Sequence, residues 1–287
     1  MLRRVKLLFT FIAATGLCAC APLKLQLANA AASFGHYTRL ANLAYGPQQA
    51  NKLDVYRPLH GDHHPIVVFF YGGGWNSGDK ADFKFVGGAL AESGFVTVVP
   101  NYRRYPEAMF LAFMQDAAQA VAWTRAHAQE WGADPEDLFV VGHSAGAHIA
   151  VLLALDEQYL HQAGGSTRWL RGAVGLSGPY DFLPFREAYL NELFGPPENF
   201  PRSQPINYVR ADAPPLLLMH GLEDTRVQAG NTRRLTSAMQ AVGGQVRALY
   251  FEGAGHTDLV AAFSTIKRHR LPVLQNIQAF VRSRGVE

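Results

Sequence analysis

The sequence predicts an α/β domain with a mostly parallel central sheet and helices on both of its faces. Apolar runs of strand length alternate along the chain with segments of helical periodicity, and this order produces parallel strands joined by helices. The chain has 287 residues, and 48% of them are hydrophobic, an ordinary fraction for a protein that buries a full core. Length and pattern together favour a single α/β domain.

The predicted strands and helices follow one another in a regular order. The run PIVVFFY at residues 65–71 has the apolar, β-branched and aromatic character of a buried strand. Residues 110–131 keep an apolar stripe at helical spacing, and Gly132 closes that helix. We expect strands at 53–57, 65–71, 95–100, 137–142, 171–176, 215–220 and 245–250, and helices at 83–91, 110–131, 145–156, 231–241 and 271–284.

Two segments fit no periodic template well. Residues 178–213 are rich in proline and aromatic side chains, and the segment is too short to be a domain, so we expect an excursion that lines a site and no large cap domain. Residues 28–45 are mildly amphipathic. They could pack as an N-terminal helix or form one wall of a pocket, and the sequence does not decide between these alternatives.

The first twenty residues resemble a bacterial lipoprotein signal. A positive start, Met1 to Lys6, precedes an apolar run that is too short to span a bilayer comfortably, and Leu17-Cys18-Ala19-Cys20 resembles a lipobox. This resemblance implies cleavage before Cys20 and acylation of that residue, which would anchor the protein to a membrane. An ordinary secretory signal or an uncleaved anchor is the alternative.

We therefore expect residues 1–19 to be a lipoprotein signal peptide, residues 20–38 a tether and residues 39–287 the folded domain. The protein would be exported and face the periplasm or the cell surface. Because Cys18 and Cys20 are the only cysteines, the predicted domain can hold neither a disulfide nor a cysteine metal site.

The net charge indicates no nucleic-acid partner. The formal charge of +3 comes from Arg3, Arg4 and Lys6, and the remainder of the chain carries as many acidic as basic side chains. The histidines at 60, 63 and 64 lie in a polar turn, where a solvated loop is expected rather than a metal site. We expect neither a metal nor an organic cofactor.

The sequence Gly142-His143-Ser144-Ala145-Gly146 predicts a nucleophilic serine. It stands between the apolar run LFVV and the helical AHIAVLLAL, so Ser144 would occupy a sharp turn from a strand into a helix, where its Oγ is exposed. Glycines two residues to either side remove side chains that would clash there. The helix N-terminus also directs partial positive charge toward an oxyanion.

A nucleophilic serine needs a base, and the base needs an orienting acid. Asp224 and His256 each follow a predicted strand, where the carboxyl ends of strands place functional groups in an open α/β sheet. Glu223 is the competing acid, although Asp224 matches the usual position better. His143 is interpreted as the variable residue of its motif, and His148 as a residue packed inside the helix.

A third motif, Tyr71-Gly72-Gly73-Gly74-Trp75, directly follows a predicted strand. Consecutive glycines allow backbone N–H groups to turn toward a ligand without interference from a Cβ atom. Together with the N–H of Ala145, these groups could hold the oxygen of a tetrahedral intermediate. A flexible turn is the alternative interpretation.

Four motifs in this order resemble the esterase and lipase branch of the α/β-hydrolases that carries an HGGG motif: YGGGW, GHSAGAH, HGLEDTRV and GAGHTDL. LDVYRP and NYRRYPE resemble more closely a subgroup of carboxylesterases, feruloyl-esterase-like domains, kynurenine formamidases and prenylcysteine methylesterases. The resemblance implies Ser144 as nucleophile, His256 as base, Asp224 as its orienter, and an oxyanion hole formed by the N–H groups of Gly73, Gly74 and Ala145. Tyr71 departs from the family pattern, because it replaces the usual histidine.

We therefore expect a serine esterase acting on a small-molecule ester, with short acyl groups favoured. The alternative is an arylformamidase or amidase, since the subgroup includes formamidases. A lipase is less favoured, because the sequence shows no long lid, and a binding module without catalysis is disfavoured, because all three catalytic residue types are present. The sequence does not predict an oligomeric state.

Overall fold

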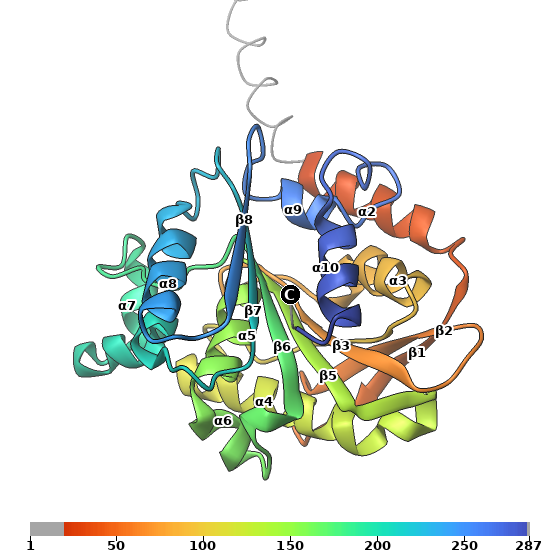
Figure 1. Ribbon diagram of the computed structural model, residues 1–287, viewed down its shortest axis with the longest axis horizontal. Coiled ribbons are helices and arrows are strands. Elements are labelled where there is room, and N and C mark those ends of the chain that lie inside the picture. The colour runs from red at the N-terminus through yellow and green to blue at the C-terminus, as the bar shows by residue number, and fades with distance from the viewer. Residues whose placement is uncertain (1–19, 286–287) are drawn as a thin grey trace, which may run out of the picture.

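One sheet of eight strands organises the chain (Figure 1). The computed structural model describes residues 20–285, with side chains from residue 25. The strands lie in the order β1-β2-β4-β3-β5-β6-β7-β8. β2 is antiparallel to both of its neighbours, β1 and β4, and all other neighbouring strands are parallel. Their bounds are β1 Tyr37–Ala44, β2 Lys52–Pro58, β3 His64–Phe70, β4 Val96–Pro100, β5 Ala133–His143, β6 Leu170–Leu176, β7 Leu216–Gly221 and β8 Val246–Phe251.

Helices cover both faces of this sheet. Figure 1 shows α3 (Lys84–Glu92) and α10 (Val273–Arg282) on one side, and α4 (Phe110–His127), α5 (Ala145–Leu155) and α8 (Gly230–Ala241) on the other. The central strands are buried on both faces, which explains why β3, β4 and β5 are apolar runs rather than alternating ones. The predicted fold class is confirmed.

The structure contains every predicted strand and helix, with ends shifted by a few residues. The helix expected at 110–131 divides into α4 and the 3₁₀ turn η2 (Ala128–Trp131). The excursion at 178–213 contains only the short helix α7 (Ala188–Phe194) and the 3₁₀ turns η4 (Pro197–Ser203) and η5 (Pro205–Tyr208), so the described residues include no large cap. Two further short helices are α6 (Glu157–Gln162) and α9 (Asp258–Ala261).

The N-terminal elements α2 (Cys20–Ala32) and β1 were not predicted. The strand β1 lies at the edge of the sheet with mostly exposed side chains, so it lacks the apolar alternation that identifies a half-buried strand. Residues 20–38, expected to act as a tether, form α2 and the start of β1. The division of the chain into signal peptide, tether and domain stays a prediction, and residues 1–19 lie outside the described residues.

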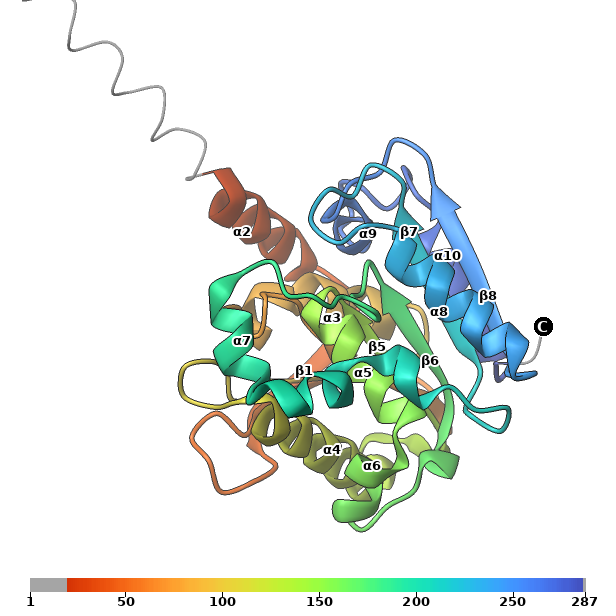
Figure 2. The same cartoon turned by 90° about the vertical axis from the view of Figure 1, so that its left-hand side faces the viewer.

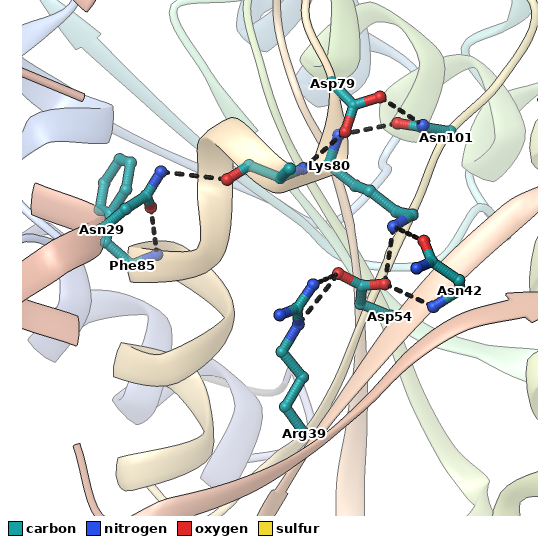
Figure 3. Close-up of polar contacts among 9 residues, drawn as sticks. Asn29, Arg39, Asn42, Asp54, Asp79, Lys80, Phe85 and Asn101 are labelled. Atoms are coloured by element: carbon teal, nitrogen blue, oxygen red, sulfur yellow. Dashed lines mark hydrogen bonds and ion pairs between the residues drawn. The ribbon is translucent and has the colours of Figure 1, made fainter. Parts of the chain in front are cut away.

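Helix α2 is held against the molecule by Asn29. Its Nδ2 donates to the carbonyl oxygens of Ala81 and Asp82 at 3.0 and 3.1 Å. Its Oδ1 accepts from the N–H of Phe85 (Figure 3). Ala28 beside it is buried. These bonds join α2 to the 3₁₀ turn η1 (Lys80–Phe83) and the start of α3. No helix within residues 20–285 combines the length and apolar content needed to cross a bilayer.

A buried ion cluster holds η1 from its other side (Figure 3). Lys80 Nζ lies 2.8 Å from Asp54 Oδ1 and 2.6 Å from Asn42 Oδ1, and the Asp54 side chain is completely inaccessible. Arg39, which is partly exposed, pairs with the second carboxylate oxygen. Burial acts to raise the pKa of Asp54, but hydrogen bonds from Lys80, Asn42 and Arg39 outweigh it and lower the pKa.

We predict that Lys80→Met lowers the free energy of unfolding by about 3 kcal/mol, because it leaves a buried carboxylate short of a partner. Arg39→Gln, which removes the more exposed partner of the same carboxylate, should cost about 1 kcal/mol or less. Urea denaturation of both variants measures this difference. The loss in Lys80→Met should shrink as the pH falls through the lowered pKa of Asp54, because protonation removes the ion pair in the parent protein. Equal losses in the two variants would contradict the prediction.

Candidate active site

The carboxyl ends of β5, β7 and β8 bring together the three side chains that the sequence singled out. Ser144 directly follows β5, Asp224 lies three residues after β7, and His256 lies five residues after β8. The Ser144 hydroxyl donates to His256 Nε2 at 2.9 Å, and His256 Nδ1 donates to Asp224 Oδ2 at 2.8 Å. This is the relative placement that a nucleophile, a base and an orienting acid require.

The turn at Ser144 is strained, and its glycines make it possible. Ser144 has φ 54° and ψ −120°, outside the usual regions for a residue with a side chain. A Cβ atom at Gly146 would lie 2.0 Å from the carbonyl oxygen of Phe70, and one at Gly142 would lie 2.1 Å from the carbonyl oxygen of Gly146. Both clashes involve backbone atoms, so neither position accepts a side chain without moving α5 away from the sheet.

The loop after β3 presents backbone N–H groups beside Ser144. Gly73 and Gly74 have φ values of 140° and 60°, which favour glycine. The Gly73 carbonyl accepts hydrogen bonds from the N–H and the hydroxyl of Ser77, so the N–H of Gly74, on the opposite edge of the same planar peptide, points away from Ser77. The N–H of Ala145 lies in the first turn of α5, which leaves it without an intrahelical acceptor. All three residues line the same cavity as Ser144.

Asp224, not Glu223, is the acid that contacts His256. Its side chain is inaccessible, and Oδ1 accepts from the N–H of Val227 at 2.9 Å, while Glu223 is exposed. Burial acts to raise the pKa of Asp224, but hydrogen bonds from His220 and His256 and from the Val227 N–H outweigh it and hold the pKa well below its usual range. The carboxylate therefore stays ionised beside the imidazole.

His143 has a role that the sequence interpretation missed. Its Nε2–H donates to the carbonyl oxygen of His256 at 2.9 Å, across 113 positions of sequence. Burial, assisted by the neighbouring His256, lowers the pKa of His143 to about 3, so the ring is neutral at physiological pH. It thus fixes the backbone of His256. No signal in one sequence distinguishes this residue from any other at the variable position of the motif.

Two further histidines that the sequence analysis considered, His148 and His64, have structural partners. His148 is buried in α5, as expected, and donates from Nε2 to the carbonyl oxygen of Ser203 at 2.7 Å. His64 lies 2.9 Å through Nδ1 from the carbonyl oxygen of Gly94. Within residues 20–285, no group of three or more His, Cys, Asp and Glu side chains is placed to hold a metal ion.

Tyr71, at the position of the usual family histidine, is a core residue. Its ring stacks between Phe83 and Tyr102, with centroids 5.3 and 4.9 Å away, and its hydroxyl donates to Asn101 Oδ1 at 2.9 Å. Tyr71 is fully buried. The tyrosine therefore supports the glycine loop from beneath and does not occupy the cavity.

A cavity of about 1210 Å³ surrounds Ser144 and His256. The excursion lines one side of it, as expected, from Pro179 to Leu190, and Tyr189 donates to the carbonyl oxygen of Gly74 at 3.0 Å. Helix α2 and η1 line another side. The sequence left open whether residues 28–45 pack as a helix or form a wall of the pocket. Most of that segment forms the edge strand β1 instead, and only its start belongs to α2, where Ala28 lines the cavity.

The sheet order, the strained serine after β5 and the cavity at the carboxyl ends of the strands define the α/β-hydrolase fold class. Within that class the chain belongs to the BD-FAE family, whose model matches residues 53–239. The resemblance noted from the sequence motifs is confirmed.

Curated relatives and solved structures agree with this class. The chain is 30% identical over 241 residues to an isoprenylcysteine alpha-carbonyl methylesterase of Arabidopsis thaliana, covering 76% of this chain and 56% of the relative. It is 31% identical to esterase LipC of Mycobacterium tuberculosis, covering 77% and 60%. The propionate-bound structure of a Thermogutta terrifontis esterase is 25% identical, with a TM-score of 0.71, covering 88% and 96%. The chain thus spans little more than half the length of the two curated relatives.

We predict that Gly146→Ala lowers the free energy of unfolding by about 3 kcal/mol, because its Cβ would collide with the backbone of β3. Gly255→Ala is the matched control. A Cβ there would lie 3.5 Å from the nearest atom, Asp258 Oδ2, so its cost should stay below about 1 kcal/mol. Thermal denaturation of the two variants compares them. A Gly146→Ala variant as stable as the control would show that α5 can move.

Proposed function

We propose that this protein is a serine hydrolase that cleaves a carboxylic ester through an acyl-enzyme on Ser144. One observation carries the proposal: the continuous hydrogen-bonded row Asp224, His256, Ser144 opens into a cavity beside the backbone N–H groups of the glycine loop. The names of the relatives, which are esterases, support an ester as the substrate.

Each group has a distinct task in the proposed reaction. Ser144 Oγ attacks the carbonyl carbon of the ester while His256 Nε2 takes the hydroxyl proton. The developing oxyanion accepts hydrogen bonds from the N–H groups of Gly73, Gly74 and Ala145. Protonated His256 then gives its proton to the departing alcohol. Water, activated by the same imidazole, hydrolyses the acyl-enzyme and regenerates the serine.

The acid supplies orientation and charge. Because the pKa of Asp224 is held low, its carboxylate is ionised at every pH at which an esterase would work. It keeps the Nδ1 proton of His256 in place, which leaves Nε2 free to accept from Ser144. It also stabilises the imidazolium that forms as the serine attacks.

The favoured substrate is a small ester with a short acyl group. The alcohol that leaves an ester has a lower pKa than the amine that leaves an amide. An ester therefore depends less on protonation of its leaving group by the His256 imidazolium. A structurally similar esterase binds propionate, a short-chain acid, which supports this preference. Hydrolysis of an N-formyl or aryl amide instead of esters would select the amidase alternative.

We predict that Ser144→Ala lowers kcat/KM for p-nitrophenyl acetate at least about 10⁴-fold, since the nucleophile is lost. Ser264→Ala, which alters another serine lining the same cavity, should retain activity within a few fold. Stopped-flow release of p-nitrophenolate measures both. Comparable activity in Ser144→Ala and the parent protein would overturn the assignment of the nucleophile.

We also propose that the protein is an exported lipoprotein anchored through Cys20. The lipobox-like sequence supports this, and α2, which begins at Cys20, leads from the anchor directly to the wall of the cavity. We predict that Cys20→Ser moves the protein from the membrane fraction to the soluble fraction of expressing cells, whereas Cys18→Ser leaves it at the membrane. Fractionation and metabolic labelling with a fatty acid measure the change. Membrane retention of unlabelled Cys20→Ser would support an uncleaved anchor instead.

A further inference from the structure

Helix α2 lies outside the part of the chain that the family model matches, yet it contributes to the cavity around Ser144. Leu25 and Ala28 both line this cavity, and their spacing of three residues places them on one face of α2. Figure 2 shows α2 and α9 at the same end of the molecule, and Val260 and Ala261 of α9 also line the cavity.

The α2 side of the cavity is mainly apolar. Phe83 and Phe85 line it beside Leu25 and Ala28. Two charged residues also occur there, and both have partners: the Asp82 carboxylate accepts from the N–H of Asp79 at 3.1 Å, and Lys267 lies 3.3 Å from Asp258. Neither charge therefore needs a partner from a ligand.

The side of the cavity formed by the excursion has a mixed chemistry. The excursion contributes apolar side chains such as Phe182 and Leu183, but also the charged Arg186 and Glu187. Two more charged residues follow on this side, Arg226 in the loop after β7 and Arg234 in α8. A hydrocarbon chain laid along these groups would remove them from water without compensation. The α2 side carries fewer charged side chains than the excursion side, so an apolar chain of the substrate fits it better.

Asn29 holds in place the apolar wall, which is formed by Leu25, Ala28, Phe83 and Phe85. Its three hydrogen bonds end on Ala81, Asp82 and Phe85, so they bracket Phe83 in the sequence. The same η1 turn is tied to the body of the protein by Lys80 (Figure 3). Because α2 and η1 are held by hydrogen bonds on both sides, they do not move aside for a longer acyl chain, and they therefore limit the acyl length that the cavity accepts.

On these grounds, and resting on the proposed ester hydrolysis, we propose that α2 forms the end of the acyl-binding site, where Leu25 and Ala28 set the length of acyl chain accepted. Leu25→Ala deepens the site, so the preferred p-nitrophenyl ester should become longer, with kcat/KM for the decanoate rising about tenfold relative to the acetate. Ala28→Leu fills the site, so the same ratio should fall about tenfold. The two variants shift one ratio in opposite directions.

The experiment uses the full chain and two substrate series: p-nitrophenyl esters of increasing acyl length, and acetate esters of alcohols of increasing length. Leu59→Ala, an exposed leucine that does not line the cavity, is the matched control and should leave both profiles unchanged. Thermal denaturation identifies a variant that fails to fold, and either folded variant alone still tests the direction of its shift.

Opposite shifts in the acyl series alone would support the inference. Unchanged acyl profiles in folded variants that retain Ser144-dependent hydrolysis would overturn it and leave the proposed function intact. Shifts confined to the alcohol series would overturn it as well, because α2 would then contact the leaving group. Absence of Ser144-dependent hydrolysis in the parent protein would overturn the proposed function, and this inference with it.

Discussion

The close crossing of α5 over the ends of β3 and β5 is the constraint on which the site depends. Gly142 and Gly146 permit backbone atoms to approach where a Cβ would lie 2.0 to 2.1 Å from a carbonyl oxygen. That approach forces Ser144 into a positive φ and points its Oγ out of the sheet. It also places the N-terminus of α5 beside the cavity that the glycine loop lines, so Ser144 and the proposed oxyanion donors share one cavity.

A network of hydrogen bonds and an ion pair around η1 connects α2 and β2 to the glycine loop beside this crossing. Lys80 joins η1 to Asp54 of β2, Asn101 accepts from the Lys80 N–H, and Asn29 joins η1 to α2. Because η1 follows the glycine loop within a few residues, the network positions both the loop and the apolar wall. The N-terminal helix is thereby coupled to the site by hydrogen bonds, although it stands outside the family match.

Local chemistry explains how much of the fold and site could be predicted. The glycines around Ser144, between an apolar strand-like run and a helical run, indicate a strand-to-helix turn, because a Cβ at either glycine would clash with backbone atoms. Asp224 and His256 could be placed because each follows an apolar strand, and parallel strands end at one edge of a sheet. Edge strand β1 could not be predicted, since an exposed strand needs no apolar alternation.

The sequence by itself therefore determined the fold class, the position of Ser144, Asp224 and His256 after predicted strands, and the glycine-dependent turn. All three follow from short-range periodicity and backbone sterics. Only the tertiary structure decided between Asp224 and Glu223, assigned His143 to the backbone of His256 and placed α2 against the cavity. These three features depend on contacts between residues far apart in the chain, and such contacts exist only once the sheet and its helices have packed.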